Sequence, residues 1–446
     1  MARHRASRRH GDRPRAWAGR ELKGKRRAAI AVTAAGLAAA GVALLLTGGD
    51  GDGGDERPQR SRAPAHHGLH VDRTARRVER LRGLRFDRVP RLVVVGRREM
   101  RRLARSLAPA REPAQERAER IVLTQTAMTD PESLGALDAV ADEPVGLFSS
   151  EHPDRVYLHG ELVRQDPREA EVTLAHELVH ALEHQNVGLD QPVAGVLDDS
   201  GMAELAVVEG SATLVEAMYR IRHRGYAGPV DVVLRMTDRR DRTVPAAALY
   251  GFPYSVGSRY VLALRRRGGW RAVARARRRP PRSTAEVLGA ARRGRPAASP
   301  ALPRLGAPWQ RLARGGFGAA AAYALLSGFG ERAKAAAARR MARSIRAGSM
   351  AVWTRGRSRC ALPCRDRAVA AVAVRAGSAR AARTMRRRLE ASLNELADVR
   401  PAGARGGPLR IEDGGAAFAR RGSTLTLVFA PSASLAARLA RAPARG

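Results

Sequence analysis

Residues 173–185 have the sequence Thr-Leu-Ala-His-Glu-Leu-Val-His-Ala-Leu-Glu-His-Gln. Because apolar residues recur there at the spacing of one helix face, we expect a helix over about residues 167–186. The residues of that face are Leu174, Leu178, Ala181 and Leu182. His176 and His180 lie four residues apart, just over one helical turn. Both imidazoles therefore project from the same side and can bind one tetrahedral metal ion.

Glu177 lies about 100° around the predicted helix from His176. Its carboxylate can therefore sit beside the metal without binding it, where a general base takes a proton from water. The pattern His-Glu-x-x-His thus indicates a zinc hydrolase. The alternative interpretation is an amphipathic helix with two histidines on its surface.

Such a site needs a third protein ligand. His184 cannot share the ion with His176, because eight residues, about 12 Å along the helix axis, separate the two. We expect His184 to face solvent or to lie outside the set of ligands. Glu209 is the first candidate, because its helical neighbours are small and mostly apolar, and a carboxylate buried among them needs a cation. Glu204 is the alternative, although it also suits the N-terminal part of a helix.

Two segments resemble gluzincin-type metallopeptidases, and in particular a group of bacterial membrane-anchored proteins with the same His-Glu-x-x-His motif. These segments are residues 173–185 and the stretch Val208-Glu209-Gly210-Ser211-Ala212-Thr213. Further similar stretches are Phe252–Gly257, Gly268–Trp270 and Pro280–Thr284. The chain departs from this group at two positions, because the group usually has an acidic residue where Ser211 stands and no histidine at residue 184.

The resemblance implies a zinc ion as cofactor, with His176, His180 and Glu209 as its ligands. It also implies a peptide or protein substrate and Glu177 as the general base of hydrolysis. A further donor must stabilise the oxyanion that forms on the scissile carbonyl. Tyr254 is the first candidate for this role, and the others are His152 and Tyr260.

We expect an α+β fold with two parts. The first is a zincin-like, mainly helical catalytic domain over residues 71–300, and the second is an α+β C-terminal region over residues 301–446. The catalytic domain should contain a small sheet, with strands at residues 91–96, 145–149 and 155–158, and helices over residues 201–223 and 253–266. In the C-terminal region we expect helices over residues 309–326, 332–346 and 378–397 and strands over residues 368–374 and 424–430.

The N-terminal part predicts a membrane anchor. A basic leader, residues 1–27, precedes the uncharged residues 28–47, which as a helix would span about 30 Å, the thickness of a bilayer core. The basic flank should stay cytoplasmic, which places the catalytic domain outside the cytoplasm. A flexible linker, rich in Gly, Asp, Pro and Arg, follows over residues 48–70. The alternative is a cleaved signal peptide, which would make the protein secreted.

The chain carries a formal net charge of +38 over 446 residues. Nearly all of its basic residues are arginine, so a genome-wide codon bias accounts for part of this charge. The alternative is attraction to anionic cell-envelope material such as lipid headgroups. The absence of zinc-finger spacing and of interleaved aromatic residues disfavours nucleic acid as the partner. Cys360 and Cys364 are either a local disulfide or an idle pair of thiols.

Three functions remain open from the sequence. The first is an anchored, extracytoplasmic zinc metallopeptidase. The second is a catalytically inactive zincin-like protein that binds an envelope partner. The third is a basic, membrane-tethered interaction protein that holds no metal.

Overall fold

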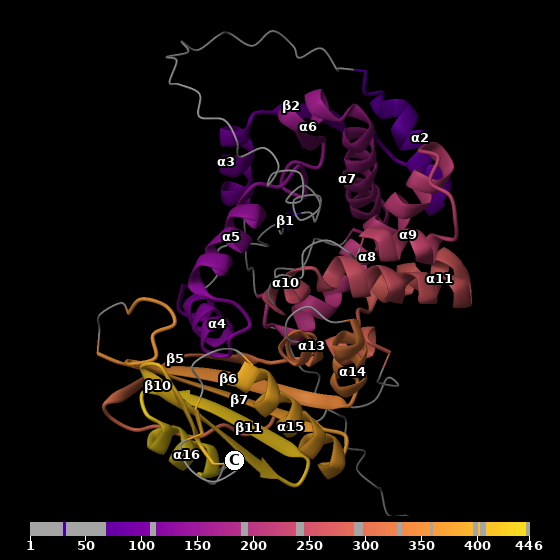
Figure 1. Ribbon diagram of the computed structural model, residues 1–446. Helices are drawn as coiled ribbons and strands as arrows, with labels where there is room; N and C mark the ends of the chain where they lie inside the picture. Colours follow the sequence, from indigo (N-terminus) through magenta and orange to yellow (C-terminus); the bar gives the residue numbers. More distant parts are fainter. Residues whose placement is uncertain are drawn as a thin grey trace, which may run out of the picture.

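The structure of this protein is a computed structural model. The structure describes residues 30–32, 68–107, 113–188, 195–237, 245–289, 298–327, 332–356, 360–395, 400–401 and 407–442. Two sheets and many helices make up a mixed α+β fold (Figure 1). The α+β class that the sequence predicts is therefore confirmed.

A four-stranded sheet lies in the N-terminal half, with the order β1-β3-β4-β2. Its strands are β1 (Ile30–Val32), β2 (Arg91–Val95), β3 (Gly146–Ser149) and β4 (Arg155–His159). β3 and β4 form the expected antiparallel hairpin, whereas β2 pairs with β4 in parallel. β1 pairs antiparallel with β3, so its three residues, which lie within the stretch predicted as a membrane helix, form a strand instead.

Most of the predicted N-terminal elements lie outside the described residues. These are the leader 1–27, the anchor 28–47 apart from residues 30–32, and the linker 48–70 up to residue 67. Among the helices that are described, none combines the length and the apolar character needed to cross a bilayer.

The same half of the chain contains most of the described helices. They are α2 (Val71–Arg82), α3 (Arg97–Leu107), α4 (Pro113–Gln125), α5 (Pro131–Asp142), α6 (Gly160–Gln165), α7 (Pro167–Val187), α8 (Asp199–His223), α9 (Val230–Thr237), α10 (Pro245–Tyr250), α11 (Phe252–Arg278) and α12 (Thr284–Val287). Of these, α3, α6 and α7 pack against this sheet. Local signals set the ends of α7. Asp166 accepts a hydrogen bond of 2.9 Å from the backbone N–H of Glu169, and Pro167 occupies the first turn, which suits a residue without an N–H. Gly188 ends the helix in the left-handed conformation, at φ 65°.

α8 and α11 cross in direct backbone contact. A Cβ added to Gly257 of α11 would lie 2.2 Å from the carbonyl oxygen of Ala206 in α8. A Cβ on Gly210 of α8 would lie 2.4 Å from the carbonyl carbon of Gly257. Only glycine permits this approach, which brings α11 against the part of α8 that carries Glu209.

The C-terminal half is built on an antiparallel seven-stranded sheet with the order β5-β6-β7-β11-β10-β9-β8. Its strands are β5 (Trp309–Gly316), β6 (Ile345–Arg355), β7 (Ala368–Ala376), β8 (Arg400–Pro401), β9 (Leu409–Ile411), β10 (Gly414–Arg421) and β11 (Thr424–Ala430). α13 (Ala319–Ser327), α14 (Arg332–Ala342) and α15 (Ala379–Glu395) pack on one side of the sheet, and α16 (Ala433–Arg441) packs on the other (Figure 1). Cys360 and Cys364 form a disulfide.

Two predictions in this half were wrong. Residues 309–316 form strand β5 rather than the first half of a helix, because they pair with β6, about 40 residues further along the chain. The helix expected over residues 332–346 ends at Ala342, and Ile345 begins β6. Strand pairing between distant segments overrides local helix preference at both places.

The two halves share one hydrophobic core. The largest cluster of buried side chains joins Leu134, Leu197 and Phe252 to Phe317 and Leu326. Asp199, at the start of α8, accepts hydrogen bonds from the backbone N–H and the hydroxyl of Thr284, and that hydroxyl accepts one from the N–H of Ala320. The seven-stranded half thus supports the N-terminal end of α8.

Candidate metal centre

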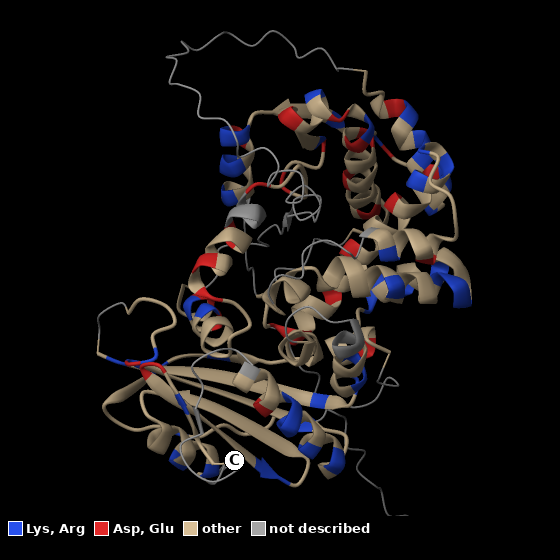
Figure 2. Cartoon of the chain, in the orientation of Figure 1, with Lys and Arg blue, Asp and Glu red and all other residues tan. Residues whose placement is uncertain are grey.

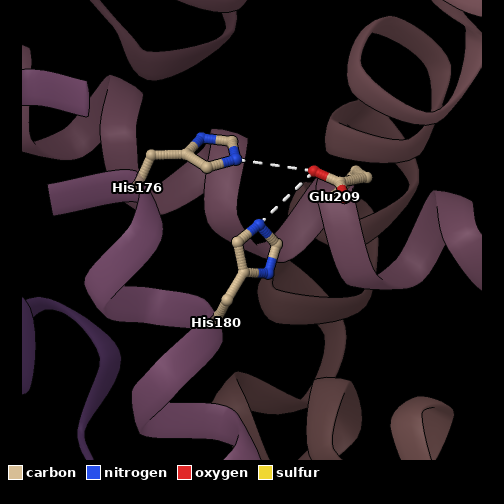
Figure 3. Close-up of side chains that lie close together, drawn as sticks. All are labelled: His176, His180 and Glu209. Carbon is tan, nitrogen blue, oxygen red and sulfur yellow. Dashed lines mark ion pairs between the residues drawn. The ribbon is translucent and has the colours of Figure 1, made fainter. Parts of the chain in front are cut away.

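Two neighbouring helices bring three potential ligands together. His176 and His180 project from α7, and Glu209 projects from α8 (Figure 3). One carboxylate oxygen, Oε2 of Glu209, lies 3.4 Å from Nε2 of His176 and 3.5 Å from Nε2 of His180. All three ligand atoms lie within 4.8 Å of one another. In a tetrahedral zinc site with bonds of about 2.1 Å, two ligand atoms lie about 3.4 Å apart, so the spacing fits a zinc ion.

The three side chains are sealed from solvent. His176 is 2% exposed, His180 is 3% exposed, and Glu209 is fully buried. Within the described residues, Nε2 of each histidine and both oxygens of Glu209 are buried without a hydrogen bond. Buried polar atoms are normally hydrogen-bonded, and one cation would satisfy several of these atoms at once. The donor set, two imidazoles and a carboxylate, is one that zinc accepts.

The electrostatics also favour a positive charge at this point. Burial raises the pKa of Glu209, but His180 and His176 lower it by more, to about 2. Burial lowers the pKa of His176, but its contacts with Glu209 and Glu216 raise it by more, to about 10. The buried, ionised carboxylate therefore needs a cationic partner, a role that protonated His176 can fill and that a metal ion would fill when both imidazoles are neutral.

Glu177 is fully buried beside the start of β3. A Cβ added to Gly146 would lie 2.6 Å from Oε1 of Glu177. Gly146 therefore leaves the space that the carboxylate of Glu177 occupies. The motif thus places Glu177 on the same helix as the two histidines but directs its carboxylate toward the sheet.

A series of charged side chains contacts Nδ1 of His176, on the side of the ring opposite the metal position. Nδ1 of His176 lies 3.0 Å from Oε2 of Glu216, and Nε and Nη2 of Arg220 donate to Oε1 of Glu216 at 3.1 and 3.0 Å. Arg220 in turn donates two hydrogen bonds, of 2.8 and 2.5 Å, to Glu169. A carboxylate on Nδ1 fixes the imidazole with Nε2 facing the metal position and increases its basicity. Glu216 was not among the residues predicted from the sequence, although it lies seven residues, about two turns, after Glu209 and therefore on the same face of α8.

A second buried network joins four helices next to the centre. Glu183 of α7 accepts hydrogen bonds from Arg82 of α2 at 2.7 Å, from Arg277 of α11 at 3.0 Å and from Ser211 of α8 at 2.5 Å. Arg82, Arg277 and Glu183 are 1%, 3% and 2% exposed. Burial raises the pKa of Glu183, but the charges of Arg82 and Arg277 lower it by more, so it is lower than usual. Ser211, one of the two departures from the resembled group, therefore contributes to holding α7 against α8.

The other candidates are not members of the three-residue cluster. Glu204 is partly exposed on α8 and is not part of the cluster. His184 packs its ring against Phe148, with the ring centroids 5.7 Å apart, and is not part of the cluster either. His152 is exposed in the β3–β4 turn. Tyr254 and Tyr260 lie on α11, partly exposed, on either side of the Gly257 crossing point.

Comparisons with protein-family models, with curated proteins and with solved structures found no match to this chain.

Proposed function

We propose that this chain is a membrane-anchored, extracytoplasmic zinc metallopeptidase with a zincin-like catalytic half. One observation carries the proposal: two imidazoles from α7 and one carboxylate from α8 meet at tetrahedral spacing in a fully buried centre, and Glu177 follows the first imidazole in sequence. The expected anchor is supported by the uncharged residues 28–47 that follow a basic leader, and a bilayer span would replace the pairing of residues 30–32 with β3.

His176, His180 and Glu209 would hold the zinc ion. When bound, the ion would supply the Lewis acid that acidifies a water molecule and stabilises negative charge on a carbonyl oxygen. Glu216 keeps His176 in the tautomer that presents Nε2 to the ion. With two neutral imidazoles and one carboxylate as ligands, the two positive charges of a zinc ion would exceed the single negative charge of Glu209, and the resulting net positive charge would favour a developing oxyanion.

Glu177 is the proposed general base. Its carboxylate takes the proton of the attacking water and passes that proton to the leaving nitrogen when the peptide bond breaks. Tyr254 is the proposed donor to the oxyanion. Its place one turn before Gly257 puts it close to where α11 crosses α8.

Paired variants of the full chain test the metal part of the proposal. We expect about one zinc ion per chain in the wild type, and its loss in His180→Ala and in Glu209→Gln. The matched controls, His184→Ala on α7 and Glu204→Gln on α8, should keep the ion. Metal content measured by mass spectrometry distinguishes the two pairs, and retention of zinc in all four variants would contradict the ligand assignment.

Glu177→Gln tests the catalytic part. We expect this variant to keep its zinc and to lose activity on a general protein substrate, because the amide cannot accept the proton. Unchanged turnover by Glu177→Gln would remove Glu177 from the mechanism. A wild-type chain that holds zinc but hydrolyses no peptide would support the alternative of an inactive, envelope-binding protein.

The anchor is tested separately. We expect the full chain to remain in the membrane fraction after extraction with alkaline carbonate, which releases peripheral proteins. Recovery of the intact chain in the soluble fraction would contradict the anchor without affecting the metal centre.

A further inference from the structure

One stretch of the chain contains a higher proportion of arginine than the chain as a whole. Residues 259–282 contain ten arginines and no acidic residue, whereas the whole chain has 81 Lys and Arg in 446 residues. Most of this stretch lies in α11, whose helical path is interrupted at Gly268 and Gly269. Arginine is also frequent in α3, with five in eleven residues, so the placement of the side chains on α11, rather than their number alone, distinguishes this stretch.

The second part of α11 lies against α2, which carries exposed arginines of its own. The side chain of Trp270 joins the two helices, because its indole N–H donates a hydrogen bond of 2.9 Å to the carbonyl of Leu81. The guanidinium groups of Arg82 and Arg265 lie 4.4 and 5.2 Å from the centre of the same indole ring. The C-terminal end of α2 therefore meets α11 at Trp270, and ribbon segments coloured as Lys or Arg lie at the right-hand edge of the molecule in Figure 2.

We call this the arginine surface and define it by six exposed side chains: Arg73, Arg76 and Arg80 of α2 and Arg271, Arg275 and Arg278 of α11. No ion pair joins any of the six to an acidic side chain within the described residues. α2 has two acidic residues: Asp72 is exposed next to Arg73, and the partly buried Glu79 pairs with Arg85. The arginine surface thus presents a net positive charge to solvent, which attracts an anionic partner.

We propose that the arginine surface binds the anionic headgroups of a phospholipid bilayer. The proposal rests on the proposed anchor for the position of the bilayer, but it depends neither on zinc nor on peptidase activity. α2 begins at Val71, directly after the predicted 23-residue linker that follows the anchor. If these 23 residues behave as a flexible chain, their root-mean-square reach is about 26 Å, which would keep α2 close to the membrane.

The chemistry of the surface suits lipid headgroups better than nucleic acid. Binding of single strands uses exposed aromatic rings on which bases stack. The one aromatic residue that joins the two helices, Trp270, is already stacked between two arginines and hydrogen-bonded to α2. Juxtamembrane arginines interact with anionic lipid over about one Debye length, roughly 8 Å at physiological salt, and the proposed anchor would bring α2 within this range. Contact through α2 and α11 would orient the metal centre relative to the bilayer and favour substrates close to the membrane.

Arginine footprinting tests the proposal on the full chain in lipid nanodiscs. The rate of modification by phenylglyoxal is measured for each arginine by mass spectrometry, in phosphatidylcholine nanodiscs and in nanodiscs that also contain phosphatidylglycerol. We expect the rates at Arg271, Arg275 and Arg278 to fall by about fivefold in the anionic nanodiscs and to recover at high salt. Three exposed arginines of one helix on the C-terminal sheet provide the internal control, namely Arg380, Arg383 and Arg387 of α15, and their rates should not change.

Equal changes at α11 and α15 would overturn the proposal, and so would rates that are the same in both kinds of nanodisc. Protection by soluble polyphosphate without protection by anionic nanodiscs would assign the surface to an anionic polymer and would also overturn it. A chain that does not enter nanodiscs contradicts the anchor. The same lipids are then presented as vesicles, and absence of protection at α11 again overturns the proposal.

Discussion

The contact between Gly210 and Gly257 predicts that a single methyl group will disturb the metal centre. Gly210→Ala places a Cβ 2.4 Å from the carbonyl carbon and 2.5 Å from the carbonyl oxygen of Gly257, where ordinary contact begins at 3.4 Å. These neighbours are backbone atoms, so they cannot rotate away. α8 and α11 must therefore separate by about 1 Å.

Two opposing effects determine how much Gly210→Ala changes the free energy of unfolding. Overpacking of this kind costs about 1–3 kcal/mol of unfolding free energy. Replacing a glycine by alanine within a helix contributes about 1 kcal/mol in the other direction. We therefore expect Gly210→Ala to lower the free energy of unfolding by up to about 2 kcal/mol. The larger effect should be on the metal, because Glu209 is the preceding residue and zinc sites tolerate errors of about 0.2 Å. A fall in zinc affinity of tenfold or more is expected.

Gly135→Ala is the matched control. Gly135 also lies within a helix, α5, but a Cβ at this position would meet nothing within 4 Å. This variant should gain up to about 1 kcal/mol of stability and bind zinc as the wild type does. Urea unfolding measures the free energy, and competition with a chelator measures zinc affinity. If Gly210→Ala were as stable as Gly135→Ala and bound zinc equally well, the close crossing would not position Glu209.

Three further predictions concern the buried charges. Glu216→Gln should weaken zinc binding by about 10- to 100-fold, because the amide orients His176 less strongly than the carboxylate does, and an unchanged dissociation constant in chelator competition would contradict this role. Arg82→Ala should lower the free energy of urea unfolding by about 3–5 kcal/mol, because it leaves Glu183 with a single arginine in the interior. The control variant Arg91→Ala, which breaks an exposed ion pair, should cost less than about 1 kcal/mol. Since the pKa of Glu183 is lower in the folded chain than in the unfolded one, its stabilising contribution is complete above the unfolded value of about 4.3 and is lost as pH falls below it. The acid-induced loss of stability should therefore be smaller in Glu183→Gln, and unfolding curves measured between neutral pH and pH 3 test this.

The elements that could be predicted from sequence are those with local causes. α7 has an aspartate cap, a proline in its first turn, a helical apolar face and a glycine at its end. The β3–β4 hairpin has β-forming residues on both sides of a short turn, and the interruption of α11 coincides with Gly268 and Gly269. Each of these signals lies within the segment that it shapes.

Strand β5 could not be predicted from the local preferences of its residues. Its residues pair with β6, so the energy that makes them a strand comes from hydrogen bonds to a distant segment. The Ala- and Arg-rich sequence around β5 favours a helix locally, and the same composition does form a helix over residues 332–342. Local preference could not distinguish the two outcomes.

Part of the metal centre could likewise be predicted from the sequence, and part depends on the tertiary structure. The repeat of a helix is enough to put His176 and His180 on one side of α7, because four residues span just over one turn. Which carboxylate of α8 faces them depends on how α7 and α8 pack, and Glu216 and Glu183 gain their roles from partners 40 and 101 residues away. A spacing along one helix follows from backbone geometry alone, whereas contacts between helices exist only after the chain has buried its apolar faces against one another.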